Sequence, residues 1–134
     1  MIYLLDSNVC IGWLRRRNRK LVARIKREPR RNIAICSVVL GELYYGAERS
    51  GVAYRARNIR ELEQLQLRFA SIPFNDSAAK AYGRLRAHLT GLGQLIGPND
   101  LLIAAIALAN GLTLVTHNTA EFSRVPGLLL EDWQ

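Results

Sequence analysis

Five acidic or amide side chains stand where a fold could bring them together. Asp6 follows a short apolar stretch, Glu42 and Asp100 lie among apolar residues with helical spacing, and Asn118 and Glu121 follow another apolar stretch. Carboxylates that converge repel one another, and a divalent cation relieves that repulsion. Oxygen ligands without a His or Cys cluster favour Mg²⁺ or Mn²⁺ over zinc. The set therefore suggests metal-assisted hydrolysis of a phosphodiester.

Each of these positions also has an ordinary structural explanation. Asp6 could simply cap the helix that follows it, and Asp100 could be favoured by the positive end of a helix macrodipole. Glu42 could be a solvent-facing helix residue. However, the helix that begins near Asp100 is apolar on nearly every face, so it belongs inside the domain and would hold Asp100 against the core.

The elements that must position these residues follow from apolar patterning. Short apolar stretches bounded by polar turns predict strands at residues 2–5, 33–36, 72–74, 112–115 and 128–130. Helical spacing predicts helices at residues 9–14, through the basic stretch 15–31, at 37–48, 54–69 and 78–89, and between Pro98 and Gly111. Strands that alternate with helices predict a single α/β domain over residues 1–134, with a central, mostly parallel sheet flanked by helices on both faces. The carboxyl ends of such strands face one crevice.

Net charge is the strongest compositional signal. The chain has a formal charge of +8 and a pI of about 10.2, which attracts polyanions. The basic residues gather in the stretch 15–31, and its first members are Arg15, Arg16, Arg17, Arg19 and Lys20. A solvated helix face, a nucleic-acid groove and a surface covered by an acidic partner protein all remain open.

Several classes are disfavoured. The longest apolar run, residues 101–109, is too short to span a bilayer, and Asp6 interrupts the N-terminal run, so we expect a cytoplasmic protein with no membrane contact. Cys10 and Cys36 lack CxxC spacing and are expected to be buried free thiols. Asn8 stands where a haloacid-dehalogenase-type phosphatase needs a second Asp, and no Walker A, GxGxxG or GxSxG motif is present.

Four segments together resemble a known family. They are Leu4-Leu5-Asp6-Ser7-Asn8, Leu40-Gly41-Glu42-Leu43-Tyr44-Tyr45-Gly46, Asn99-Asp100-Leu101-Leu102-Ile103-Ala104-Ala105 and Leu114-Val115-Thr116-His117-Asn118-Thr119-Ala120-Glu121-Phe122. In this order, and across nearly the whole chain, they resemble PIN-domain ribonucleases. More closely, they resemble the VapC toxins of bacterial type II toxin–antitoxin modules.

The resemblance implies a role for each candidate residue. Asp6, Glu42 and Asp100 would form the acidic core that binds Mg²⁺ or Mn²⁺, with Asp6 and Asp100 as direct ligands. Asn118 stands where the family has a further acidic or amide residue, and Glu121 stands nearby where many relatives carry Asp. Three polar residues would orient the carboxylates through hydrogen bonds: Ser7, Asn8 and Thr116.

The resemblance also implies partners. The chain would be an endoribonuclease toxin with an RNA substrate, acting as a homodimer. A cognate antitoxin would cover the groove and bind operator DNA, so that DNA contact is only indirect. The basic residues from Arg15 to Lys20 would contact RNA phosphates or antitoxin acids. The competing hypotheses are a non-catalytic nucleic-acid- or partner-binding module, which only Asn118 favours, and a nuclease used for DNA-linked regulation.

Overall fold

A five-stranded parallel sheet forms the centre of the computed structural model, which describes residues 1–134. Its spatial order is β3-β2-β1-β4-β5, so the N-terminal strand occupies the middle of the sheet. Tyr3 in β1 pairs with Ile33 in β2 on one side and with Thr113 in β4 on the other. The strands are β1 (Tyr3–Leu5), β2 (Ile33–Cys36), β3 (Ala70–Ile72), β4 (Thr113–Val115) and β5 (Leu130–Glu131). The predicted parallel α/β domain is confirmed.

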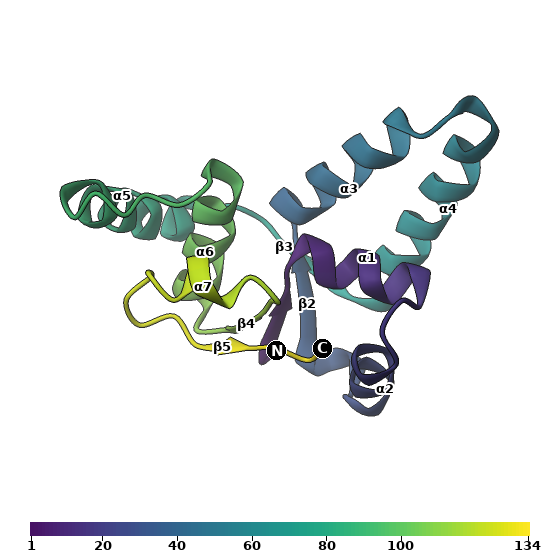
Figure 1. Ribbon diagram of the computed structural model, residues 1–134, viewed down its shortest axis with the longest axis horizontal. Helices are drawn as coiled ribbons and strands as arrows, with labels where there is room; N and C mark the ends of the chain where they lie inside the picture. The colour runs from purple at the N-terminus through teal and green to yellow at the C-terminus, as the bar shows by residue number, and fades with distance from the viewer.

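Helices flank this sheet, and two helical pairs extend from it (Figure 1). Helices α3 and α4 form a hairpin at the upper right of Figure 1, and α5 packs along α6 on the opposite side. None of the helices is long and apolar enough to cross a lipid bilayer. The helices are α1 (Ser7–Arg15), α2 (Arg19–Arg27), the 3₁₀ turn η1 (Arg30–Asn32), α3 (Ser37–Arg49), α4 (Val52–Arg68), α5 (Asp76–Gly91), α6 (Pro98–Asn110) and α7 (Thr119–Phe122).

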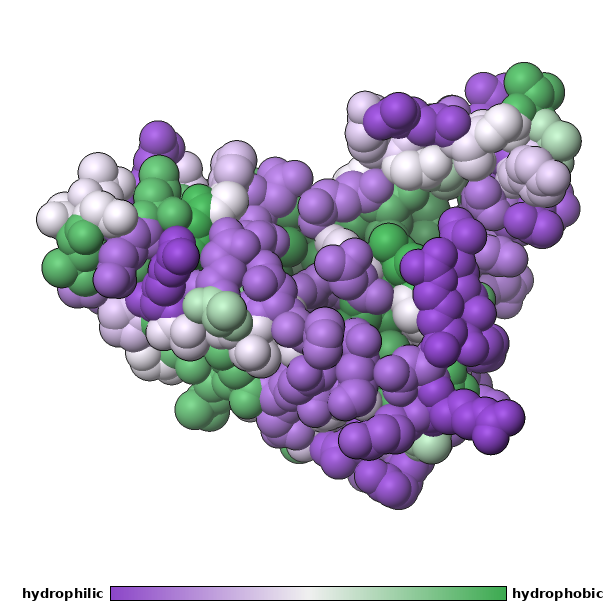
Figure 2. Space-filling view, in the orientation of Figure 1, coloured by the Kyte–Doolittle hydropathy of each residue, from purple (hydrophilic) through white to green (hydrophobic).

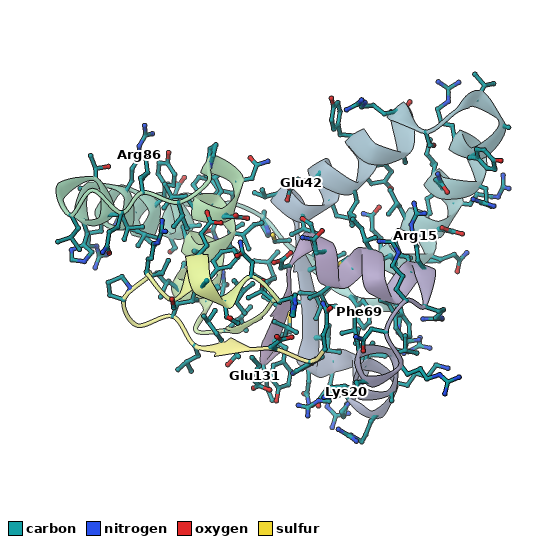
Figure 3. All side chains as sticks on the ribbon, viewed as in Figure 1. Arg15, Lys20, Glu42, Phe69, Arg86 and Glu131 are labelled. Atoms are coloured by element: carbon teal, nitrogen blue, oxygen red, sulfur yellow. The ribbon has the colours of Figure 1, made fainter.

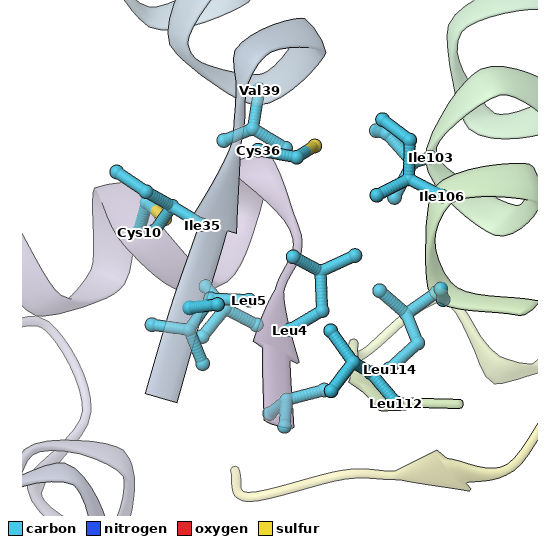
Figure 4. Packing of buried hydrophobic residues seen from close by; sticks show 14 of the residues in the cluster. Leu4, Leu5, Cys10, Ile35, Cys36, Val39, Ile103, Ile106, Leu112 and Leu114 are labelled. Atoms are coloured by element: carbon cyan, nitrogen blue, oxygen red, sulfur yellow. The ribbon is translucent and has the colours of Figure 1, made fainter. Parts of the chain in front are cut away.

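The core fills both faces of the sheet because neighbouring strand residues point in opposite directions. In Figure 4, Leu5 points toward the side of α1, whereas Leu4 points toward α6 and lies on the side of Ile103 and Ile106. All four side chains are buried. This two-sided burial explains why the strands are continuous apolar runs, and it fixes α1 and α6 relative to the strand ends.

The basic stretch 15–31 is not the continuous helix that its pattern predicts, because Arg15 is the last residue of α1 and α2 covers only Arg19–Arg27. Arg16 ends α1 in the left-handed conformation, with φ of 52°, and α2 begins three residues later. The side chain of Asn18 caps α2 by accepting a hydrogen bond from the Leu21 amide. The apolar pattern continues across this break, so the break could not be seen from the pattern. Asn18 was the available signal, because Asn is a common residue type at a helix start.

Other boundaries also differ from the prediction. Strand β3 covers residues 70–72 instead of 72–74, because Pro73 has no N–H for the ladder and Phe74 instead packs edge-on against Tyr82. Strand β5 falls at residues 130–131 instead of 128–130. Helix α5 begins at Asp76 instead of residue 78, and Asn75 caps it because the Asn75 side chain accepts the Ala78 amide. The short helix α7 lies in what the sequence indicated was only a turn.

Both cysteines are buried and free, as predicted. Burial is the main cause that raises the pKa of both thiols, and that of Cys36 rises to about 11. Such thiols are almost entirely protonated near neutral pH, so they serve as small apolar groups in the core.

Candidate metal centre

Asp6 lies where β1 ends and α1 begins, and only 6% of its surface is exposed. Its Oδ1 accepts the backbone amide of Asn8 at 2.9 Å, and its Oδ2 accepts the hydroxyl of Thr116 at 2.5 Å. Burial raises the pKa of Asp6, the two hydrogen bonds lower it, and the charge of Glu42 raises it again. The Asp6 carboxylate thus caps α1, and the Thr116 hydroxyl at the end of the neighbouring strand fixes its orientation.

Glu42 is brought to the same place by the second turn of α3. It is half-buried, and its Oε1 accepts the Ser7 hydroxyl at 2.5 Å. In Figure 3, Glu42 lies at the start of α3, above the N-terminal end of α1. The Ser7 hydroxyl therefore orients Glu42, whereas Asn8 contributes its backbone amide to Asp6 and its side chain is exposed.

Asp100 approaches from the first turn of α6. Its pKa is raised to about 6, first by burial and then by the charges of Glu121, Asp6 and Glu42. Four carboxylates from four separate elements therefore share one electrostatic environment. We call this set, Asp6, Glu42, Asp100 and Glu121, the acidic centre.

Glu121 is the most firmly held member of the acidic centre. Its Oε1 accepts the backbone amide of Gly97 at 2.7 Å, and its Oε2 accepts the side-chain amide of Asn118 at 2.9 Å. These two bonds are the main causes that lower its pKa. The Asn118 backbone amide also donates to Thr116 Oγ1 at 3.0 Å. Asn118 thus holds Glu121 instead of offering its own oxygen, and the two residues act together.

Gly97 is a site residue that the motifs did not single out. A Cβ atom at this position would lie 3.4 Å from Asp100 Oδ2 and 3.6 Å from Glu121 Oε1. Two carboxylates thus lie against Gly97 at the start of α6, and its amide binds one of them. The sequence signal was present, because a Gly-Pro pair precedes an apolar helix, but it indicated only a helix start.

The donor set fits a hard divalent cation. The four ion pairs of the structure involve other carboxylates, namely Glu28, Glu131, Glu48 and Asp132, so no side-chain cation pairs with the acidic centre. No three of its carboxylates are close enough to enclose an ion by themselves. Mg²⁺ binds through one or two carboxylates and retains several waters, so this open arrangement of oxygen atoms suits it.

The basic residues predicted as contacts do not share one surface. All five, Arg15, Arg16, Arg17, Arg19 and Lys20, are exposed, and hydrophilic surface gathers over this part of the molecule in Figure 2. Arg15 lines a groove with Glu42 between α1, α3 and α4, and Arg17 lines one with Asn118. Arg16 turns to a third groove between α1 and α4. Consecutive arginines thus serve three separate grooves.

A parallel sheet that gathers carboxylates at the ends of its central strands defines an α/β protein with an acidic, metal-compatible centre. The PIN domain model matches residues 3–128. Ribonuclease VapC2 of Rickettsia felis is 40% identical over 134 residues, which cover 99% of this chain and 98% of the relative. The tRNA(fMet)-specific endonuclease VapC of Shigella flexneri is 37% identical over 131 residues, which cover 98% of this chain and 97% of the relative.

A solved structure is also similar. A chain in the crystal structure of DNA-bound VapBC from Salmonella typhimurium has a TM-score of 0.92 and 35% identity, covering 100% of this chain and 99% of that chain. The chain belongs to the PIN-domain family, in its VapC branch.

Proposed function

We propose that this chain is a divalent-metal-dependent endoribonuclease and the toxin of a type II toxin–antitoxin pair. The observation that carries the proposal is the acidic centre itself, where burial and three neighbouring carboxylates raise the pKa of Asp100 to about 6. A protein tolerates such repulsion when a cation is bound in its working state. The ribonuclease names of the VapC relatives support the same reaction.

We assign the direct metal contacts to Asp6 and Asp100, and Glu42 would add its charge and reach the cation through a bound water. Bound Mg²⁺ or Mn²⁺ would activate water and screen the phosphate as negative charge develops. The chain itself holds the carboxylates still: Thr116 fixes Asp6 and Ser7 fixes Glu42. Preorganised groups of this kind need not rearrange during the reaction.

Glu121 borders the acidic centre at the start of α6. Its two oxygens are occupied by the Gly97 amide and the Asn118 side chain, so its negative charge stays next to Asp100. We propose that it raises cation affinity mainly by charge. Asn118 positions Glu121 and leaves the fold's acidic set intact, which weighs against a non-catalytic binding module.

The partners follow from the relatives. Since the similar Salmonella chain is part of a VapBC complex bound to DNA, we propose that this chain pairs with a cognate antitoxin that covers its groove and contacts DNA in its place. The groove beside Glu42 has apolar residues to receive such a segment, namely Ile11, Leu14, Leu43 and Leu62. A homodimer and a cytoplasmic location belong to the same proposal. Because one relative is named for transfer RNA, transfer RNA is the first substrate to test.

The test is cleavage of a transfer RNA pool by the purified protein with Mg²⁺, Mn²⁺ or EDTA. Asp6→Asn and Asp100→Asn keep side-chain shape and remove charge, and we expect each to lower the cleavage rate by about a thousandfold. Asp76→Asn is the matched control, since Asp76 is an exposed residue in the first turn of α5, and it should cut normally. Cleavage that persists in EDTA or in both site variants would refute the metal-dependent reaction, provided that both variants are folded.

A further inference from the structure

Three arginines converge at the end of α1 that lies far from the acidic centre. Arg16, Arg30 and Arg68 line a groove of about 370 Å³ beside Trp13, between α1, α4 and the 3₁₀ turn. We call Arg16, Arg30 and Arg68 the arginine cluster. Each comes from a different segment of the chain, so the fold, and not a run of sequence, brings them together.

Trp13 provides a platform for two members of the cluster. The guanidinium carbon of Arg16 lies 3.9 Å from the centre of the Trp13 ring, and that of Arg68 lies 4.8 Å from it. Arg16 also donates to the Trp13 carbonyl at 3.0 Å. Stacking on a tryptophan restrains a guanidinium in a defined orientation, so these groups are partly positioned before any ligand arrives.

The backbone conformation of Arg16 is unusual for an arginine. Arg16 is the only residue other than glycine with positive φ, at 52°. A helix commonly ends on glycine in this conformation, which is unfavourable for other L-residues. Residues held in sparsely populated conformations cluster at functional positions. An arginine here keeps its charge over Trp13 despite this cost.

The positive charges of the cluster are not neutralised within the protein. None of its members takes part in an ion pair, although Glu61 also lines the groove. Burial lowers the pKa of Arg68, and the charges of Arg30 and Arg16 lower it further. The Nε atom of Arg68 is buried without a hydrogen-bond partner. The cluster thus presents three positive charges that no ion pair within the protein offsets.

Arg24 shows that this state is not inherent to arginines on tryptophans. Arg24 lies 4.6 Å from the Trp133 ring centre, and its Nε is also buried without a partner. However, it pairs with Glu28 at 3.4 Å and Glu131 at 3.8 Å. The protein thus neutralises one tryptophan-stacked arginine internally, whereas Arg16 and Arg68 on Trp13, with Arg30 in the same groove, take part in no ion pair.

We infer that the arginine cluster binds phosphate groups of the RNA strand, at a distance from the phosphate that is cut. This inference rests on the proposed function. Helix α1 runs from Ser7 to Arg15, so Asp6 and Arg16 are separated by about 15 Å at 1.5 Å per residue. One phosphate cannot reach both ends, so the cluster holds other phosphates of the same RNA. Phosphate oxygens accept hydrogen bonds from several guanidinium groups at once, which suits three arginines better than a single carboxylate does.

The first test uses inorganic phosphate as the probe. The variant Arg16→Gln, Arg30→Gln, Arg68→Gln is compared with the control Arg49→Gln, Arg57→Gln, Arg86→Gln, which also removes three positive charges from arginines stacked on aromatic rings. We expect phosphate to raise the melting temperature of the wild type and the control more than chloride of equal ionic strength does. Phosphate also stabilises any folded protein through its exclusion from the surface, so the cluster variant should keep only a smaller difference, and equal stabilisation of all three proteins would overturn the inference.

The second test measures transfer RNA binding against salt concentration, in EDTA to prevent cutting. Each phosphate contact contributes about 0.7 to the slope of log affinity against log salt. Loss of three contacts should lower the slope by about 2 and weaken binding at least about tenfold in low salt. The control should keep the wild-type slope, and the cluster variant should still cut at saturating RNA in Mg²⁺.

The outcomes separate the two proposals. A wild type that neither binds nor cuts RNA would refute the proposed function and this inference with it. A wild type that cuts RNA while the cluster variant keeps its salt slope would refute only the inference. A cluster variant that binds RNA normally but no longer retains the antitoxin would also refute it, and would assign the cluster to the protein partner.

Discussion

Helix α1 separates two groups of like charges. At its N-terminal end the acidic centre gathers four carboxylates, and at its C-terminal end the arginine cluster gathers three guanidinium groups. No member of either group takes part in an ion pair within the protein. The sign at each end agrees with the helix macrodipole, which favours negative charge at the N-terminus and positive charge at the C-terminus.

The two ends differ in how firmly they are held. Hydrogen bonds from Ser7, Thr116 and the Gly97 amide fix the carboxylates. Two of the three arginines, Arg16 and Arg68, stack on Trp13, and stacking restrains a side chain less than several directional hydrogen bonds do. Firmly held carboxylates suit the chemical step at the acidic centre. Less firmly held guanidinium groups suit the arginine cluster, because they can adjust to RNA strands of different shape.

The largest difference between the two ends should appear when a hydrogen bond that holds the acidic centre is removed. Thr116→Val preserves side-chain shape but removes the hydroxyl that donates to Asp6 Oδ2 at 2.5 Å. Because outer partners of metal ligands contribute about 10–100-fold, we expect cleavage to fall by that factor and to need more Mg²⁺. Titration of the cleavage rate with Mg²⁺ measures both changes. An unchanged rate and midpoint would mean that Thr116 does not position Asp6.

A smaller effect, on the free energy of unfolding, should distinguish Arg24, which has ion pairs within the protein, from Arg68, which has none. Arg24→Gln removes two ion pairs and a bond to the Tyr3 hydroxyl, so we expect the free energy of unfolding to fall by about 1–2 kcal/mol. Arg68→Gln instead removes a cation that two like charges face, and should leave stability unchanged or slightly raised. Urea unfolding of the two variants makes the comparison, and an equal loss in both would contradict it.

The smallest effect concerns pH. Since the pKa of Asp100 is about 6 in the folded protein and about 3.9 when unfolded, the folded state binds the proton more tightly. The stability of the metal-free protein should therefore fall as pH rises from about 4 to 6. Asp100→Asn should remove part of this fall, about 1 kcal/mol, because solvent screens the half-exposed carboxyl.

Urea unfolding in EDTA at pH 4.5 and 7.5 measures this change. Adding Mg²⁺ at pH 7.5 should stabilise the wild type more than Asp100→Asn. The expectation would be contradicted if the wild type were more stable at pH 7.5 than at pH 4.5 and Asp100→Asn had the same pH dependence. The protein would then relieve the repulsion around Asp100 without a cation.

The sequence was most informative where local pattern and fold agree. The strand at residues 33–36 is an apolar run buried on both sides, and its bounds were predicted without error. Asp6 stood out because a polar residue ended such a run at a helix start. By contrast, the break at Arg16 depends on a left-handed residue that nothing in its type indicates.

The contacts within the site were beyond prediction for a different reason. That Asn118 would hold Glu121, and that Gly97 would lie against Asp100, depends on how α6 and α7 meet in space. Residue types and spacing indicate which groups reach an edge of the sheet but not which of them bind each other. The arginine cluster was missed similarly, because Arg68 lies 52 residues from Arg16 along the chain.

The central position of β1 has a consequence for how the protein is made. Its partner β4 and the Thr116 hydroxyl that aims Asp6 lie 110 residues further along the chain. During synthesis the first strand must wait until residues 113–116 have been made before it can pair with β4. The acidic centre therefore forms late, and a nascent chain that ends before Thr116 cannot carry a finished site.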